Sequence, residues 1–273
     1  MTAWRTWLPL LQGDPILRGE KGTGPVVMAF PQSGRGLPPA LAARMTPQAL
    51  RLPDTCWHLD ELWRPLALPG TGWVMPAFSR LVTDLNRQPD PPAVPIANST
   101  PLCAIETFGG DVVYRGVWRP IPPKSLTGWE NTGSPSTIVW RPTSRKPGGV
   151  PAALFCSTPI PSAPQKTRFA GGTPPAVAVK TGGWTLCTPV VHRAVGAVVA
   201  RYRGLGATLD YPSKGGFIVH RHARPSEAIS AFQIEVRQDL YMDPRRPETP
   251  VSPSVGLRSF IADLWESLAL CCA

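Results

Sequence analysis

The sequence predicts an α/β fold, a single domain with a mixed, mainly parallel sheet flanked by helices. Its length of 273 residues is enough to bury a sizeable core as one domain. Val26–Phe30 is a short apolar run bounded by proline and a Ser-Gly turn, as expected of a buried strand in a parallel sheet. From Pro189 onward, Val191, Val195 and Tyr202 are spaced for one helix face that ends before Gly204.

Local patterns predict the remaining elements. Pro9–Gly24 looks like an irregular, glycine-punctuated lead-in, Leu37–Leu52 favours a helix, and Trp73–Val82 favours a second strand. Ala207–Leu209 and Ile234–Val236 are expected to be further strands. A C-terminal amphipathic helix is indicated by apolar residues at helical spacing, namely Leu257, Phe260, Ile261, Leu264 and Leu268.

One segment, Gly116–Lys166, does not follow any of these patterns. It contains about ten prolines among Ser, Thr, Gly and Arg, and it has neither a strand nor a helix period. A loop of this length without structure is uncommon inside a compact domain. We therefore expect residues 116–166 to be an aberrant, poorly ordered segment.

The charge pattern and the hydropathy limit the function classes. The net charge of +10 would suggest nucleic-acid binding, but the Arg and Lys residues are scattered, without a basic run interleaved with aromatics. There is no apolar run of membrane-spanning length, and Met1–Arg5 lacks the features of a signal peptide. We expect a cytoplasmic protein without a nucleic-acid or membrane partner, and its oligomeric state stays open.

The six cysteines form no Cys-x-x-Cys pair and are not combined with His at zinc-finger spacing. Buried or incidental thiols are therefore favoured over a disulfide framework or a thiolate metal site.

Six short motifs occur in one order along most of the chain. They are Val26–Gly34, Asp54–His58, Asp84–Arg87, Cys103–Phe108, Lys214–Ile218 and Gln233–Val236, the last followed by Tyr241-Met242. Through them the chain resembles the N-formylglutamate amidohydrolases, also called N-formylglutamate deformylases, from Pro25 to Arg115 and from about Arg168 to Asp243. The resemblance implies a zinc hydrolase of the phosphorylase/hydrolase-like fold, acting on a small acidic N-acyl amino acid. It also implies a place in histidine degradation, where formate and glutamate are released.

The zinc site that the resemblance implies looks incomplete here. Gln32 stands where the family has the His of a Pro-His-Ser-Gly motif, and a neutral amide oxygen is a poor zinc ligand beside imidazole. Asp54 matches the first acid of the family's Asp-Thr-Asp and is either a candidate metal carboxylate or a helix or turn cap, while Cys56 replaces the second acid. His58 follows the family pattern but is equally explained as a structural His.

The family's Asp-Ala-His-Ser motif, the source of another metal-binding His, is absent. A codon string for Leu-Leu-Asp-Ala-His-Ser-Ile, translated one nucleotide late, gives Cys-Ser-Thr-Pro-Ile-Pro, which is the sequence Cys156–Pro161. We infer that the reading frame is displaced from near Pro142 to about Gln165. The alternative is a disordered insertion specific to this lineage.

The Asp84–Arg87 run supplies a candidate site for a substrate carboxylate. An amide and a guanidinium side by side fit a carboxylate bidentately, so Asn86 and Arg87, with Arg80, are the predicted substrate-binding residues. The alternative is an Arg salt-bridged to a surface acid, with Asn capping a turn. Glu106 and Thr107 match a Glu-Thr pair of the family and are candidates for the pocket lining.

Glu235 is the predicted catalytic residue. It interrupts an apolar segment and lies on the strand face opposite Ile234 and Val236, where it is either a general base or a solvated side chain. The Gly215–Arg221 stretch, taken as a strand, has the family's basic pair transposed, which would turn each side chain to the other face. His220 and His222 without a third ligand indicate no metal cluster.

Two hypotheses follow. The first is a metal-dependent hydrolase that removes an N-formyl or other acyl group from N-formyl-glutamate or a similar amino acid, with Glu235 moving protons. The second is a catalytically impaired or degenerate relative without a complete zinc site.

Overall fold

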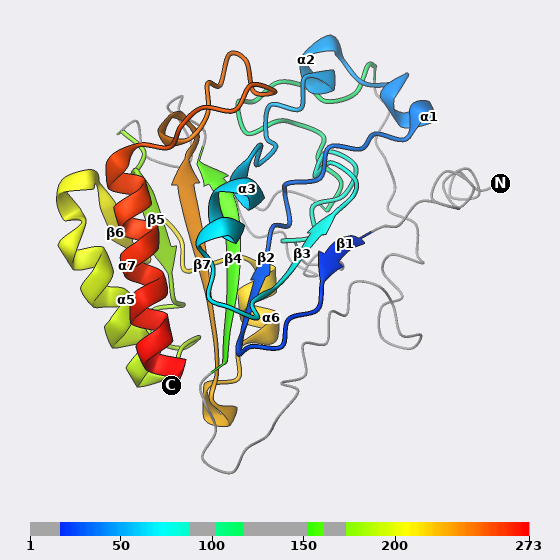
Figure 1. Ribbon diagram of the computed structural model, residues 1–273. Coiled ribbons are helices and arrows are strands. Elements are labelled where there is room, and N and C mark those ends of the chain that lie inside the picture. Colours follow the sequence, from blue (N-terminus) through cyan, green and yellow to red (C-terminus); the bar gives the residue numbers. More distant parts are fainter. Residues whose placement is uncertain (1–16, 88–101, 117–151, 161–172, 273) are drawn as a thin grey trace. The chain divides into compact units, whose positions relative to one another are not determined.

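The computed structural model describes residues 17–87, 102–116, 152–160 and 173–272, with the backbone path alone for 152–160. Its strands form one seven-stranded sheet in the order β1-β3-β2-β4-β7-β5-β6 (Figure 1). The strands are β1 (Leu17–Glu20), β2 (Val26–Ala29), β3 (Gly72–Pro76), β4 (Ala152–Ile160), β5 (Val177–Lys180), β6 (Ala207–Leu209) and β7 (Ile229–Arg237).

The sheet is mixed and mainly parallel, which confirms the predicted fold class. Strand β2 pairs in parallel with β3 and β4, β4 with β7, and β5 with β6, whereas β5 and β7 are antiparallel. The helices are α1 (Pro39–Ala42), α2 (Pro47–Leu50), α3 (Leu59–Trp63), α5 (Pro189–Arg201), α6 (Phe217–His222) and α7 (Val255–Cys272).

The chain divides into two compact units, which are described separately below. Unit 1 comprises Met1–Arg18, Pro31–Thr55 and Met75–Val139. Unit 2 comprises Gly19–Phe30, Cys56–Val74 and Trp140–Ala273 and holds most of the sheet. The predicted boundaries of a single domain, 1–273, stay a prediction.

Strand β2 is buried on both faces, as its continuous apolar run predicts. Val26 and Met28 are 0% and 1% exposed, and the side chains that alternate with them, Val27 and Ala29, are also buried. Val27 and Ala29 belong to a core cluster with Ala231 of β7 and with Val219 and Ala223. Because Val219 lies in α6 and Ala223 ends it, this helix covers one face of the sheet.

Helices α5 and α7 pack side by side, and they are drawn in yellow-green and red in Figure 1. Thr188 caps α5 by accepting a hydrogen bond from the Val191 backbone N–H, and Pro189 occupies the first turn. The ring of Tyr202 meets Phe260 of α7 edge-on, with 5.5 Å between centroids. The apolar residues predicted to mark α7 are all buried: Leu257, Phe260, Ile261, Leu264 and Leu268.

Two predicted elements are shorter than expected. Leu37–Leu52 forms two short helices, α1 and α2, because Thr46 and Pro47 start a new helix within it. Strand β3 stops at Pro76, short of the predicted Val82, because the chain then turns through Ser79. There the Val82 N–H bonds the Ser79 carbonyl and the Leu81 N–H bonds the Ser79 hydroxyl.

The lead-in Pro9–Gly24 also contains an element that the pattern did not show. Its residues 17–20 form strand β1, and residues before 17 lie outside the described part of the chain.

The expectation of disorder is wrong for part of Gly116–Lys166. Ala152–Ile160 forms β4, which lies between β2 and β7, so neighbouring strands supply its backbone partners. Pro159 comes after Cys156, the last residue in register with β2, so it interrupts none of the pairing with that strand. The rest of the segment, beyond Gly116, lies outside the described residues.

The prediction of a strand at Gly215–Arg221 is also wrong. Phe217–His222 is helix α6, because Val219 and Ala223 recur at a helical interval and bury themselves against the sheet. The argument from transposed strand faces therefore does not apply. None of the described helices is long and apolar enough to cross a membrane.

Candidate functional site

Arg80 lies between two buried carboxylates in unit 1. Its Nη1 donates to Asp54 Oδ2 at 2.5 Å, and its Nε donates to Asp84 Oδ2 at 3.1 Å. All three side chains are at most 3% exposed, and the guanidinium stacks over the Phe108 ring at 4.0 Å. Arg80 is therefore ion-paired, but its acidic partners are buried, whereas the alternative interpretation placed such an acid at the surface.

The local sequence explains why Asp84 faces inward. The Asp84 N–H bonds the Leu102 carbonyl, which fixes the residue against a distant segment. Its Oδ1 accepts a hydrogen bond from the Asn86 backbone N–H at 3.1 Å, the arrangement of an Asx turn. The Asp-Leu-Asn-Arg run is therefore a turn organised around its own aspartate.

The two carboxylates differ in their charge environment. Burial opposes ionisation of Asp84, but the guanidiniums of Arg80 and Arg87 and the hydrogen bonds from Gln32 and Asn86 outweigh it, so its pKa is lowered. Burial raises the pKa of Asp54, and the attraction of Arg80 does not overcome it. Asp84 has a second guanidinium beside it, that of Arg87, and the two cations favour its ionised form. The negative charge of this pair of carboxylates is therefore concentrated on Asp84.

Gln32, the first predicted metal residue, belongs to the same network. Its Nε2 donates to both carboxylate oxygens of Asp84, at 3.2 and 3.0 Å, and its side chain is buried. Asp54, the second predicted metal residue, accepts the Phe108 N–H on both oxygens, at 3.1 and 2.9 Å, in addition to Arg80. Neither of these residues caps a helix.

The described residues do not fit a zinc site. An amide nitrogen cannot ligate a metal, and it is this end of Gln32 that faces Asp84. The oxygens of Asp54 are already occupied by a cation and a backbone N–H. No group of three or more His, Cys, Asp or Glu residues able to hold a metal occurs within 17–87, 102–116 and 173–272.

The predicted carboxylate-binding residues gather around Asp84. Asn86 is 7% exposed, and the Arg87 side chain is 34% exposed with its Nε 3.5 Å from Asp84 Oδ2. Arg87 is thus the accessible guanidinium of this network, oriented by Asp84. Arg80 is buried, and its Nη2 has no hydrogen-bond partner among the described residues.

Glu106 and Thr107 immediately precede Phe108, which contacts Asp54 and Arg80. Glu106 is exposed and pairs with Val112 across a tight loop. Thr107 is buried, but its hydroxyl accepts the Asp111 N–H at 3.0 Å and so closes that loop. Their role as pocket lining stays a prediction.

Glu235, the predicted catalytic residue, lies in β7 of unit 2 and is 3% exposed. The alternative of a solvated glutamate is therefore wrong. Its Oε1 lies 3.0 Å from Lys180 Nζ and accepts the Gln233 Nε2 amide at 2.9 Å. Gln233 Oε1 in turn accepts the Gly216 N–H, at the start of α6, at 2.8 Å.

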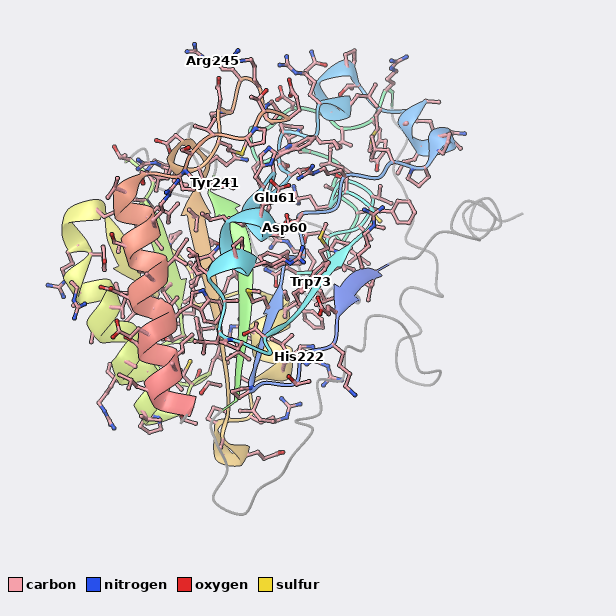
Figure 2. All side chains as sticks on the ribbon, viewed as in Figure 1. Asp60, Glu61, Trp73, His222, Tyr241 and Arg245 are labelled. Atoms are coloured by element: carbon pink, nitrogen blue, oxygen red, sulfur yellow. The ribbon has the colours of Figure 1, made fainter. Side chains whose placement is uncertain are left out.

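His58 is a structural residue, as one of its two predicted roles required. Its Nδ1 contacts Glu61 Oε2 at 3.0 Å and its Nε2 contacts the Pro247 carbonyl at 2.9 Å. Figure 2 labels Glu61 on α3, the helix that His58 precedes. His220 and His222 lie two residues apart in α6, a spacing that turns side chains to different sides of a helix.

The cysteines within the described side chains are free thiols: Cys56, Cys103, Cys187 and Cys271. The first three are buried, and burial raises the pKa of Cys103 and of Cys187 to about 12. Such thiols stay protonated at neutral pH, and their burial agrees with the prediction of buried or incidental cysteines.

Sequence reasoning missed three residues of these networks. The sequence motifs contain Asp84 and Gln233 without indicating a role for either, and Lys180 lies outside the motifs. A signal for Lys180 exists, because a lysine that continues the apolar run Val177–Val179 is expected to find a buried partner.

Comparison with known proteins places the chain in a family. The sequence profile of the N-formylglutamate amidohydrolases matches residues 24–130 and 150–242. The N-formylglutamate deformylase of Pseudomonas aeruginosa is 27% identical over 258 residues, covering 93% of this chain and 96% of the relative. That of Pseudomonas putida is 26% identical over 246 residues, covering 86% and 88%.

Solved structures agree on the fold. The crystal structure of an N-formylglutamate amidohydrolase from Ralstonia eutropha JMP134 matches with a TM-score of 0.65 at 20% identity, over 94% of this chain and 97% of that one. A gene product of Agrobacterium tumefaciens matches with a TM-score of 0.60 at 14% identity, over 94% and 96%. The profile match covers most of the chain, and the chain therefore belongs to the N-formylglutamate amidohydrolase family.

Proposed function

We propose that this protein hydrolyses the formamide bond of N-formyl-glutamate, or the acyl amide of a similar acidic amino acid, and releases formate. Two relatives matched over most of the chain are named N-formylglutamate deformylase, which supports this substrate class. The observation that carries the proposal is the accessible Arg87, held by Asp84 beside Asn86.

Arg87 and Asn86 bind a substrate carboxylate in this proposal. A guanidinium and an amide together offer several N–H donors in a geometry that suits a carboxylate. Asp84 fixes one edge of the Arg87 side chain, so less rotamer entropy is lost when a substrate binds. An N-acyl glutamate has two carboxylates, and Arg80 Nη2 is the proposed donor for the second.

Glu235 moves the proton. Water adds to the formyl carbon, the carbon–nitrogen bond breaks, and the carboxylate accepts a water proton and passes it to the leaving amine. The products are formate and the free amino acid, so atoms and charge balance. The Lys180 and Gln233 contacts hold one oxygen of Glu235 in place for this step.

A direct test is formate release from N-formyl-glutamate by the purified protein, with Glu235→Gln as the inactive control. N-formyl-alanine, which lacks the side-chain carboxylate, is the comparison substrate. We expect a preference for N-formyl-glutamate that Arg87→Ala reduces. Turnover that is equal for both substrates, or unaffected by Glu235→Gln, would contradict the proposal.

A second candidate function is a binding-competent but catalytically impaired relative. The specific observation is that Gln32 and Asp54 are both engaged by other protein groups, Asp84 and Arg80 respectively. Calorimetry separates the candidates, because the impaired protein binds N-formyl-glutamate through Arg87 and releases no formate.

We further propose that the displaced reading frame explains the missing Asp-Ala-His-Ser motif. Sequencing the coding DNA across residues 140–168 tests this: reads with no nucleotide lost or gained relative to an Asp-Ala-His-Ser frame would show that the insertion is genuine. A cytoplasmic location and a role in histidine degradation go with the proposed substrate.

A further inference from the structure

Lys180 is a fully buried cation within the part of unit 2 that the structure describes. It ends strand β5 after three apolar residues, Val177–Val179, and is 0% exposed. Lysine is rarely buried completely unless a partner compensates its charge. Its environment therefore has to supply a specific partner.

Strand register supplies that partner. In the antiparallel pairing of β5 with β7, Lys180 lies opposite Gln233, and Ala178 lies opposite Glu235. Gln233 and Glu235 are two residues apart and so project from the same face of β7. Lys180 is thus the diagonal neighbour of Glu235, and its Nζ reaches Oε1 at 3.0 Å.

Further polar groups complete a chain through unit 2. Lys180 Nζ donates to the Ser213 hydroxyl at 2.6 Å, and Gln233 bridges Glu235 to the Gly216 N–H at the start of α6. The pair is therefore hydrogen-bonded at both ends. A buried ion pair is stable under this condition, whereas removing one partner leaves an uncompensated charge.

We propose that Lys180 is a positioning residue that holds Glu235 ionised and in one orientation. The inference rests on the proposed proton-transfer role of Glu235. Lys180 and Gln233 both engage Oε1, so two contacts fix the orientation of the carboxylate. Lys180 itself does not contact the substrate in this scheme.

Among the described residues, groups from three strands and a loop lie around Glu235. Strand β5 contributes Lys180, β7 contributes Gln233, and β4 places the backbone of Thr158 opposite Glu235. Ser213, in the loop before α6, reaches the pair through Lys180. Of these groups, Lys180 is the one that carries a charge.

The ionisation of Glu235 can be measured without any turnover. In protein labelled with carbon-13 at the glutamate carboxyl carbons, the Glu235 resonance is the one that disappears in Glu235→Gln. We expect Lys180→Met to move the titration of this resonance toward higher pH, because the ammonium no longer favours the carboxylate. Lys214→Met, an exposed lysine in the same loop as Ser213, is the matched control and should change nothing.

An unchanged titration in a folded Lys180→Met protein would overturn the proposal. If Lys180→Met does not fold, the double variant Lys180→Met with Glu235→Gln shows whether the two residues compensate each other's charge. The neutral amide of the glutamine no longer needs a cation beside it. A double variant that folds supports the pairing, and one that also fails to fold contradicts it. Lys180→Arg, which keeps the charge, should titrate like the original protein.

Kinetics with N-formyl-glutamate connect the pair to catalysis. We expect Lys180→Met to lower kcat, leave KM little changed and move the acid limb of the kcat/KM profile to higher pH, with recovery in Lys180→Arg. If the original protein releases no formate, the proposed function fails while the titration still decides the role of Lys180. A loss of activity in Lys180→Met without a change in the pH profile would indicate a structural role and contradict the proposal.

Discussion

Gln32 turns its amide nitrogen toward Asp84, within 3.2 Å of one carboxylate oxygen and 3.0 Å of the other. This contact settles which end of the amide faces the acidic side chain. A histidine at the same position would present a ring nitrogen that can accept a metal, whereas the amide nitrogen of Gln32 can only donate. The network around Asp84 is thus neutralised by protein donors: Arg80, Arg87 and Gln32.

The first prediction concerns zinc. We expect the purified, chelator-washed protein to bind zinc at well below one equivalent, because Gln32 donates to Asp84 and Asp54 is paired with Arg80. Elemental analysis after dialysis against zinc checks it, with Asp54→Asn as the comparison. Stoichiometric zinc that Asp54→Asn abolishes would show that Asp54 is a ligand after all.

Replacing Arg80 should destabilise the fold strongly. Arg80→Met leaves the carboxylates of Asp54 and Asp84 buried without their shared cation, and breaking a buried pair costs about 3–5 kcal/mol. Urea unfolding followed by circular dichroism measures the loss. Arg201→Ala, which removes an ion pair with Asp263 on the surface, is the matched control and should have a much smaller effect. Equal losses in the two variants would show that the Arg80 network is not a stabilising core.

Lowering the pH should reduce the free energy of unfolding, partly through protonation of Asp84. Its pKa in the folded state is below the ordinary value of 3.8, so its contribution to stability is complete above that value and is lost as the pH falls through the folded pKa. The pKa of Asp54 is raised by burial, so protonation of Asp54 at low pH favours the folded state instead. We expect the free energy of unfolding of Asp84→Asn to fall less steeply below pH 3.8 than that of the original protein. Parallel curves would contradict this.

Restoring two features should produce or increase activity. Gln32→His together with a restored Asp-Ala-His-Ser frame rebuilds two nitrogen donors, and the motif would fall near Thr158, which is in register with Glu235. We expect formate release from N-formyl-glutamate in this repaired protein. The repaired protein carrying Glu235→Gln is the control. A folded, zinc-loaded protein that releases no formate would leave only a broader acyl-amino-acid hydrolase.

In that repaired protein, Arg87→Ala should raise KM with little change in kcat. A charge-assisted hydrogen bond contributes about 1.5–3 kcal/mol, so the expected increase in KM is roughly 10- to 150-fold. Steady-state kinetics measure it, and Arg44→Ala, an exposed arginine of the same unit, should leave KM unchanged. An effect confined to kcat would assign Arg87 to the transition state rather than to substrate binding.

Periodicity predicted the elements whose buried face is encoded locally. Strand β2, helix α5 and helix α7 were found where their apolar spacing placed them. Periodicity failed where tertiary partners decide the structure. Strand β4 is held by two neighbouring strands despite its irregular sequence, and α6 is a helix because Val219 and Ala223 bury against the sheet.

The charged networks show a similar limit. The motif Asp84–Arg87 identified the segment that contains the charged network. A sequence cannot show, however, with which acidic residue a given arginine forms an ion pair. That Arg80 contacts both Asp54 and Asp84 depends on segments brought together by the fold. The Lys180 and Glu235 pair depends on the antiparallel register of β5 and β7, which no local pattern encodes.

The place of β4 in the sheet has a consequence for synthesis on the ribosome. Strand β2 is made early, but its neighbour β4 begins only at Ala152, and β7 follows at Ile229. One edge of the apolar strand β2 therefore stays unpaired until most of the chain has emerged from the ribosome. An unpaired strand edge can pair with other chains and so lead to aggregation. We expect the nascent protein to depend on chaperones that shield β2 during this interval.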